Sequence, residues 1–270
     1  MAAPPSRLLN FAGTETQPLN QNARHKFAAS FALCAYQANA IYSFIPKNAC
    51  STMRFSLAVA NGCVEPDGNF RWIHLNNSTF AADLRSLATA AYTFVILRCP
   101  FDRIASSFLD KVVDQYPDAW TLTPQSEGEL KPSEISFRRF VAMLAQNRKL
   151  KANIHWRPQT DFLVYRQYDR YFDFSRMDLV KTELADRIGM ELIDTRAMIG
   201  HDSSRLQKVD GRFADMPAWE IAAMKREGNA PALTSLIDKD IACQLAAIYR
   251  DDLAAYRELA GGEATPLPLD

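Results

Sequence analysis

The run YTFVIL, Tyr92–Leu97, constrains the fold of this 270-residue chain more than any other stretch. It contains β-branched and aromatic residues without polar alternation, a pattern typical of a strand that is buried on both faces. Such strands occur in parallel sheets, where the crossover connections cover the sheet with helices. A helix is predicted directly after the run, because proline favours the first helical position and Pro100 lies there. The chain is therefore expected to contain a parallel sheet covered by helices.

Strand-like and helical patterns alternate along the rest of the chain. Ala40–Ile45 is a predicted strand, and Thr52–Ala60 is a predicted helix that ends at the Asn61-Gly62 pair. The later predictions are a helix from Pro100 to Tyr116 that Pro117 ends, a helix at Phe137–Asn147, a strand at Tyr171–Phe174, and helices at Leu179–Ile188, Glu220–Glu227 and Ile237–Leu259. This alternation predicts an α/β fold with a mainly parallel central sheet flanked by helices.

One domain is expected over residues 25–260, between a flexible N-terminal arm at residues 1–24 and a flexible tail at residues 261–270. The least regular interior segment covers residues 114–136 and is rich in Pro, Ser, Thr and acidic residues. A long interruption of this kind in a compact domain is expected to be a functional loop or a disordered excursion.

The composition excludes several classes of protein. The 31 basic residues balance the 31 acidic ones, so the net charge gives no indication of a nucleic-acid or membrane partner, although local basic patches remain possible. The five cysteines show no CxxC spacing, which argues against a disulfide framework or a zinc site and favours a reducing compartment. No apolar run is long enough for a transmembrane or secretory segment. A cytoplasmic location is therefore expected.

The stretch PKNACST, residues 46–52, joins the first predicted strand to the first predicted helix. A helix N-terminus offers unpaired backbone N–H groups and a positive dipole end, and Lys47 would add a mobile positive charge. The small residues that would let an anion approach the backbone are Asn48, Ala49, Cys50, Ser51 and Thr52, and the last two offer hydroxyl groups that could also cap the helix. The Walker pattern GxxxxGK[ST] is absent, which disfavours a standard nucleoside triphosphatase. An exposed lysine beside a helix cap would explain the same residues.

A second strand–loop–helix unit follows in FVILRCPFDRIASSFLDK, where Arg98 comes directly after the buried strand. Ligands of open parallel sheets bind outside the carboxyl ends of the strands, so Arg98 and Ser106 could converge on a second phosphate. The helix is expected to turn Ile104, Phe108 and Val112 to the core and Arg103, Ser106 and Asp110 outward. An arginine bonded to local carbonyls and a solvated serine is the plainer interpretation.

At these residues the chain resembles the sulfotransferases that use 3′-phosphoadenosine 5′-phosphosulfate (PAPS), most of all the carbohydrate sulfotransferases. PKNACST is similar to their 5′-phosphosulfate loop, and RCPFDRIASSFLDK to the motif in which an arginine and a serine, here Arg98 and Ser106, hold the 3′-phosphate. Cys99 stands where the family more often has an acid. IHWRPQTDFLVYRQYDRYFDFSRMD and IYRDDLAAYREL also resemble family segments, so the resemblance extends over Ile41–Leu259.

The resemblance implies a P-loop-like α/β fold and an enzyme that moves the sulfuryl group from PAPS to a hydroxyl acceptor, expected to be a carbohydrate. Lys47 would stabilise charge on the departing nucleotide, and residues 48–52 with Arg98 and Ser106 would bind the donor. No metal is required. A base that operates near neutral pH suits histidine, and the candidates are His74, which is favoured, and His155. The alternatives are a P-loop-type small-molecule kinase and a non-catalytic adenine-nucleotide-binding protein.

Overall fold

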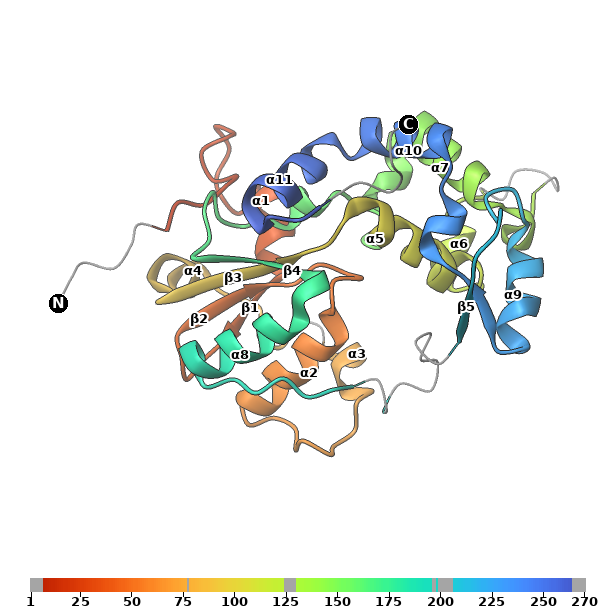
Figure 1. The fold of residues 1–270 in the computed structure, drawn as a ribbon. Helices are drawn as coiled ribbons and strands as arrows, with labels where there is room; N and C mark the ends of the chain where they lie inside the picture. The colour runs from red at the N-terminus through yellow and green to blue at the C-terminus, as the bar shows by residue number, and fades with distance from the viewer. Residues whose placement is uncertain (1–6, 77, 124–129, 196–197, 199–205, 264–270) are drawn as a thin grey trace. The chain divides into compact units, whose positions relative to one another are not determined.

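The chain divides into two compact units in the computed structural model, which describes residues 7–76, 78–123, 130–195, 198 and 206–263. Unit 1 consists of Met1–Leu97 and Gln159–Gly200, and unit 2 consists of Arg98–Pro158 and His201–Asp270. The four-stranded sheet belongs to unit 1 (Figure 1).

The sheet of unit 1 has the strand order β1-β2-β3-β4. Its strands are β1 (Ala32–Ala35), β2 (Ala40–Ser43), β3 (Tyr92–Leu97) and β4 (Arg170–Asp173). β1 pairs with β2 in antiparallel fashion, whereas β2 with β3 and β3 with β4 pair in parallel. β3 has the predicted bounds, and all of its residues after Tyr92 are buried. The predicted α/β class with a mainly parallel sheet is confirmed.

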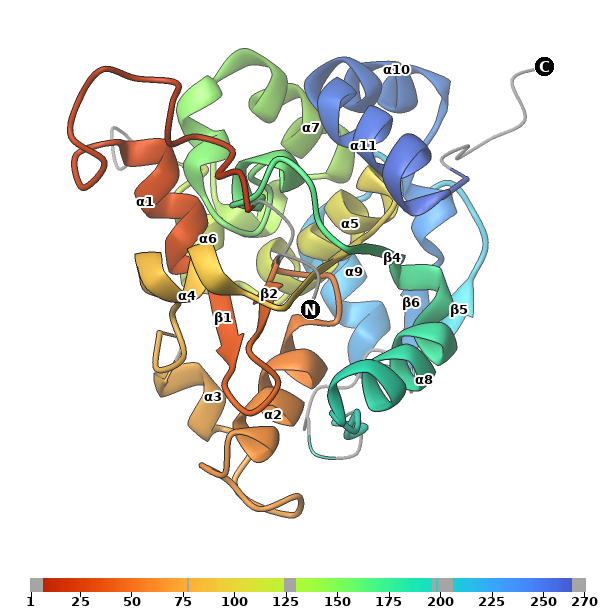
Figure 2. The ribbon, with the colours of Figure 1, turned by 90° about the vertical axis from the view of Figure 1, so that its left-hand side faces the viewer.

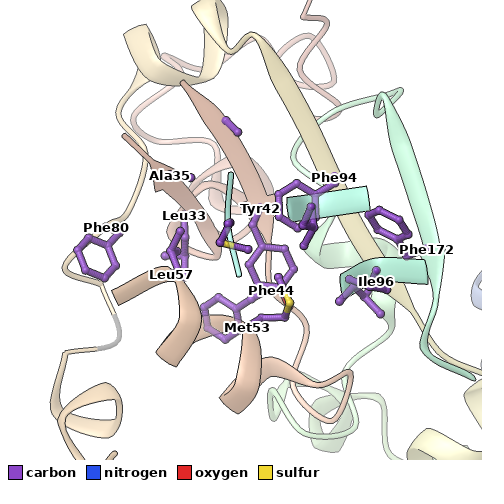
Figure 3. Packing of buried hydrophobic residues seen from close by; sticks show 14 of the residues in the cluster. Leu33, Ala35, Tyr42, Phe44, Met53, Leu57, Phe80, Phe94, Ile96 and Phe172 are labelled. Carbon is purple, nitrogen blue, oxygen red and sulfur yellow. The ribbon is translucent and has the colours of Figure 1, made fainter. Parts of the chain in front are cut away.

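Helices cover this sheet. The helical segments of unit 1 are α1 (Ala23–Ser30), α2 (Cys50–Ala60), α3 (Trp72–Leu75), α4 (Leu84–Thr89), the 3₁₀ turns η4 (Gln159–Phe162) and η5 (Phe174–Arg176), and α8 (Met177–Ile188). α2 and α8 lie on the same face of the sheet in both ribbon views (Figures 1 and 2). Their apolar residues share one core with alternate residues of the strands, and Figure 3 shows its centre, with Met53 of α2 beside Tyr42 and Phe44, and Leu57 beside Leu33.

Residues 7–22 pack onto unit 1, although the sequence placed them in a flexible arm. The Phe11 side chain is buried, and Asn22 caps α1 by accepting from the backbone N–H of His25 (2.9 Å). Arg7 donates to the carbonyl oxygens of Ala90 (2.9 Å) and Ala91 (3.0 Å). α1, which begins at Ala23 inside the expected arm, and β1 were not predicted either. Residues 1–6 of the arm and 264–270 of the expected C-terminal tail lie outside the described part of the chain.

Unit 2 is mainly helical. Its elements are α5 (Pro100–Ser107), η1 (Phe108–Val112), α6 (Pro117–Trp120), η2 (Pro132–Glu134), α7 (Phe137–Gln146), η3 (Arg148–Ala152), β5 (Gln207–Val209), α9 (Ala218–Arg226), β6 (Asn229–Pro231), η7 (Leu233–Leu236), α10 (Lys239–Ile248) and α11 (Arg250–Ala260). Four fully buried aromatic side chains pack edge-on or tilted in its core, namely Phe108, Phe137, Phe140 and Trp156.

Two predicted helices of unit 2 differ from the structure. The helix expected from Pro100 to Tyr116 ends its α-helical part at Ser107 and continues as the π-helical turn η1, and Pro117 begins α6 instead of only ending a helix. Proline suits the first position of a helix because the missing N–H has no intrahelical partner there. The single helix expected at Ile237–Leu259 is divided at Tyr249, whose hydroxyl donates to the Trp156 carbonyl oxygen (2.6 Å).

The contacts of Arg7 allow a test of how firmly the N-terminal residues belong to unit 1. Its buried guanidinium lies 2.7 Å from Oδ2 of Asp169. Burial alone would raise the pKa of the Asp169 carboxyl, but the hydrogen bonds from Arg7 and Thr93 outweigh burial and hold this pKa below its usual value. The pair therefore stabilises the folded state above the unfolded carboxyl pKa of about 3.9, and this stabilisation is lost as the pH falls through the lower folded value.

We expect Arg7→Met to lower the free energy of unfolding by about 2–3 kcal/mol near neutral pH, because hydrogen bonds to charged groups contribute at this level. The loss should shrink below about pH 4 as Asp169 becomes protonated. The control is Arg250→Met, since the Arg250–Asp251 pair is exposed and such pairs contribute little. Urea unfolding at several pH values measures both, and equal stability of Arg7→Met and the wild type would show that the N-terminal residues are not anchored.

Candidate functional site

The loop between β2 and α2 has an unusual backbone for a segment without glycine. Lys47 (φ 74°) and Ala49 (φ 55°) have positive φ angles, whereas Asn48 between them does not. When right-handed and left-handed residues alternate, their successive backbone N–H groups point into one concave surface, and such a surface can bind an anion. The first intrahelical donor of α2 is the N–H of Met53, which bonds to the Ala49 carbonyl oxygen (3.0 Å). The N–H groups before it, at Cys50, Ser51 and Thr52, form the N-terminus of an 11-residue helix.

This helix end suits an anion because, among the residues that the structure describes, no side chain caps it. Ala49 is the N-cap and makes no side-chain capping bond, and the first turn contains no acidic residue. Ser51 and Thr52, which were expected to cap the helix as an alternative, lie inside its first turn and do not cap it. The Thr52 hydroxyl lies 3.0 Å from the hydroxyl of Thr195 in the segment after α8. Lys47, Cys50, Ser51 and Thr52 are all half-buried, so a ligand at the loop would contact them from one side.

Asn48 differs from its neighbours because its side chain is fully buried. Its Nδ2 donates to the carbonyl oxygen of Ile96 in β3 (2.9 Å) and to Oε1 of Gln159 (2.6 Å). The side chain is therefore turned into the protein, and Asn48 would act on a ligand through the shape of the loop. Gln159 was not among the predicted site residues, although it ends the HWRPQ segment that resembles the family.

His74 lies on α3, which is attached to α2. Arg54, in the second turn of α2, donates to the carbonyl oxygen of Ile73, the residue before His74. The rings of Phe70 and His74 make an edge contact (centroids 5.5 Å apart), and Phe70 also contacts Phe55 of α2 (5.9 Å). The His74 side chain is exposed. Unit 1 therefore carries this imidazole on α3, which contacts α2, and carries Lys47 in the loop that precedes α2.

Arg54 is a candidate site residue that the sequence patterns did not reveal. Its side chain is buried, and burial lowers the pKa of its guanidinium, although nearby Cys50 and Tyr42 oppose this shift. Within the described residues no carboxylate forms an ion pair with it. Helical side chains lean toward the N-terminus, so an arginine one turn after the loop adds positive potential there. In the sequence, the position of Arg54 four residues after Cys50 is the feature that could have indicated that it lies one helical turn beyond the loop.

Arg98, Cys99 and Ser106 belong to unit 2. Burial lowers the pKa of Arg98 to about 10, while the neighbouring Asp102 opposes the shift, so the guanidinium remains positive at neutral pH. Cys99 is the N-cap of α5 and forms no side-chain cap, and Ser106 is half-buried near the end of this helix. The predicted core stripe of this segment, Ile104, Phe108 and Val112, is confirmed as fully buried.

Arg103 does not face outward as predicted. The side chain is fully buried and donates to the carbonyl oxygens of Arg157 (2.8 Å) and Ile154 (3.3 Å). The helical period predicted its direction relative to Ile104, but unit 2 folds residues 154–157 over that side of α5. A guanidinium with several donors can satisfy these carbonyls, which explains why a charged residue is tolerated there.

His155 is held in unit 2 by its own backbone and by an acidic neighbour. Ser107 donates to its carbonyl oxygen (2.7 Å), and its N–H donates to Oδ1 of Asn153 (3.0 Å). Its Nε2 lies 3.7 Å from Oδ1 of Asp118, and Asp118 also accepts from Asn153 (2.8 Å). No sequence pattern linked Asp118 to His155, because Asp118 lies on α6, within residues 114–136, for which the sequence showed no regular pattern. The contact would stabilise the imidazolium form of His155.

The structure thus assigns the sequence-predicted site residues to two groups. Unit 1 contains Lys47, residues 48–52 and His74, and unit 2 contains Arg98, Ser106 and His155. In the ranges that the structure describes, no cluster of three or more His, Cys, Asp and Glu side chains is arranged to hold a metal ion. In the same ranges no helix has the length and apolar character needed to span a bilayer.

The left-handed backbone at Ala49 predicts an unusual response to glycine. An L-residue in this conformation costs about 1–2 kcal/mol, and glycine is also the better N-cap. After allowance for the greater freedom of glycine in the unfolded chain, Ala49→Gly should raise the free energy of unfolding by about 0.5–1 kcal/mol. Ala58→Gly, in the interior of the same helix, should lower it by about 1 kcal/mol or more. Urea unfolding would contradict the assigned backbone if both variants were destabilised alike.

One comparison with known proteins gives a match. A model of the sulfotransferase family matches residues 32–257, which include both strand–loop–helix units and both histidine candidates. No curated protein and no solved structure gives a significant match. The family match covers most of the chain, and the α/β architecture with a mostly parallel sheet is consistent with a sulfotransferase fold. The chain belongs to the sulfotransferase family.

Proposed function

We propose that this protein transfers the sulfuryl group of PAPS to a hydroxyl group of a carbohydrate, without a metal ion. Family membership supports sulfuryl transfer, and the observation that supports a donor with a 5′-phosphosulfate is the loop before α2. That loop combines an uncapped helix N-terminus, a backbone of alternating hand and Lys47. The family match crosses both units, which supports one sulfotransferase domain over residues 25–260.

Sulfuryl transfer asks the protein mainly for positioning and charge stabilisation, by analogy with phosphoryl transfer. The N–H groups of Cys50, Ser51 and Thr52 would bind the oxygens of the 5′-phosphate and the sulfonate. Lys47 would stabilise the negative charge that develops on the bridging oxygen of the leaving nucleotide. Buried Arg54 would make the potential at the loop more positive. Of these groups, Lys47 acts on charge that is greatest in the transition state, which is where binding energy raises the rate.

The 3′-phosphate of the donor is assigned to Arg98 and Ser106. Arg98 is positive at neutral pH despite its burial. Charge-assisted hydrogen bonds to a doubly charged phosphate would compensate the guanidinium for the hydration that it loses on burial. The half-buried hydroxyl of Ser106 can donate to the same group. Two phosphate contacts of this kind distinguish a 3′,5′-bisphosphorylated nucleotide from ATP, which has no 3′-phosphate.

We assign the general base to His74, which unit 1 carries together with Lys47. The attachment of α3 to α2 through Arg54 and Phe70 supports this assignment, because it holds the exposed imidazole in a fixed position relative to α2, the helix that follows the phosphosulfate loop. His155 is the second candidate, and its contact with Asp118 favours it, since the carboxylate would stabilise the imidazolium formed after proton transfer. The Nδ1 atom of His155 is buried and Nε2 faces Asp118, so an acceptor hydroxyl would reach Nε2 only beside that carboxylate.

Nucleotide binding tests the proposal directly. In thermal unfolding without magnesium, 3′-phosphoadenosine 5′-phosphate should stabilise the protein strongly, and ATP should do so much less. A ligand that binds only the folded state stabilises it in proportion to the logarithm of its concentration over Kd, so a titration also gives the affinity. Stabilisation by Mg-ATP alone would instead indicate a phosphotransferase. Nucleotide binding without sulfuryl transfer across glycan, phenol, lipid and peptide acceptors would favour a non-catalytic binding protein.

Arg98→Ala locates the 3′-phosphate. The variant should bind the bisphosphorylated nucleotide about 1.5–3 kcal/mol more weakly, the usual value of a charge-assisted hydrogen bond. Ser106→Ala should cause a smaller loss. Adenosine 5′-phosphosulfate, which lacks the 3′-phosphate, is the control, and its affinity should not change. An equal loss for both nucleotides would reject the assignment of Arg98.

The two histidines are separated by their effects on rate. His74→Ala should lower kcat by about 10²–10⁴-fold, the usual contribution of a general base, while the affinity for the donor stays the same. The limb of the pH–rate profile near neutrality should also disappear. His155→Ala is the matched variant and should retain that limb. If His155→Ala shows this pattern and His74→Ala retains nearly full kcat, the base is His155.

A further inference from the structure

Two buried amides connect the phosphosulfate loop to the end of the sheet. Asn48 is 0% exposed and Gln159 is 1% exposed. Nδ2 of Asn48 donates to the carbonyl oxygen of Ile96 (2.9 Å) and to Oε1 of Gln159 (2.6 Å). All three residues belong to unit 1, so the contact is internal to one compact unit.

The chemistry of the partners determines how both amides are oriented. The Ile96 carbonyl can only accept, so the Asn48 atom that faces it must be the donor Nδ2. Gln159, at 2.6 Å from that nitrogen, must then present its oxygen. Oδ1 of Asn48 is buried and has no hydrogen-bond partner in the described structure. A buried acceptor without a hydrogen-bond partner costs free energy. In this orientation the two bonds from Nδ2 are made, and Oδ1 is left without one.

The hydrogen bonds of Asn48 connect the loop to β3 at the point where β2 has already ended. β2 ends at Ser43, which is opposite Val95, while β3 continues to Leu97. The Ile96 carbonyl therefore lies beyond the last residue of the neighbouring strand, and the Asn48 side chain occupies the place of a strand N–H. The residues on either side of Asn48, Lys47 and Ala49, have the positive φ angles that non-glycine residues adopt only at an energetic cost.

We propose that Asn48 and Gln159 are positioning residues that hold the loop in its anion-binding backbone conformation. The inference rests on the proposed function of the loop and adds the requirement for this amide pair. Neither side chain touches the donor. They act by fixing Asn48 against β3, so that the turn on each side of it keeps the N–H groups directed at the 5′-phosphate and sulfonate. The family-like Pro158-Gln159 pair then serves the loop that lies far from it in sequence.

The test measures affinity for two nucleotides in four variants. Asn48→Ala removes both bonds, whereas Gln159→Met keeps the side-chain length and replaces the whole amide, including the acceptor Oε1 and the donor Nε2. Both should bind 3′-phosphoadenosine 5′-phosphate at least about tenfold more weakly, because a net hydrogen bond contributes on this scale. Their affinity for adenosine 3′-phosphate, which does not occupy the loop, should stay within about twofold. The double variant should lose little more than Asn48→Ala alone, since both act through one contact.

Asn61→Ala is the matched control. Asn61 ends the same helix, and its side chain also makes two bonds to the main chain, from Nδ2 to the Cys34 carbonyl oxygen (2.8 Å) and from the Tyr36 N–H to Oδ1 (3.0 Å). The control should lower the unfolding temperature as Asn48→Ala does and leave both affinities unchanged.

Equal losses for the two nucleotides, or a loss of the same size in Asn61→Ala, would show that the pair only stabilises the fold and would overturn the proposal. Unchanged affinity in Gln159→Met would overturn it as well, and this variant decides the question if Asn48→Ala does not fold. Failure of the wild type to bind the bisphosphorylated nucleotide would be a failure of the proposed function instead.

Discussion

The early end of β2 is the constraint on which the rest of the site in unit 1 depends. β2 stops at Ser43 while β3 continues to Leu97, so the chain leaves the sheet beside carbonyl groups that a longer strand would have paired. A buried carbonyl needs a donor, and Asn48 supplies one from within the loop. That bond brings the loop back to the sheet edge and starts α2 at Cys50 with its N–H groups uncapped. The bond that satisfies this backbone acceptor thus also shapes the loop that we propose as the anion site.

The parallel sheet and some of the helix ends could be predicted from the sequence. Both β3, with its uninterrupted apolar run, and the end of α8 at Gly189 are determined by residues close together in the chain. The local sequence pattern was therefore sufficient to predict them. β1 is a strand of only four residues, and its neighbours stabilise it. The break at Tyr249 depends on a bond to Trp156, which no local pattern shows.

The candidate site divides in the same way. Lys47 and the small residues after it were predicted because a strand, a turn and a helix follow one another in the chain. The partners of these residues were not predicted, since Gln159 and Asn48 are brought together by the order of the strands, and Asp118 and His155 by the packing of α6. Arg103 shows the opposite error, where a correct helical period gave the wrong environment. Periodicity gives directions around a helix, but only tertiary structure determines what lies in each direction.

The absence of glycine from the loop has a consequence for how a donor would bind. Glycine-rich phosphate loops sample many backbone conformations before a ligand orders them, and that lost entropy weakens binding. Lys47 and Ala49 have far fewer conformations available, and the buried amide of Asn48 holds the backbone between them. The energetic cost of the left-handed residues is therefore met when the chain folds, not when the nucleotide arrives. A loop of this kind trades some folding stability for a binding surface that has little left to order.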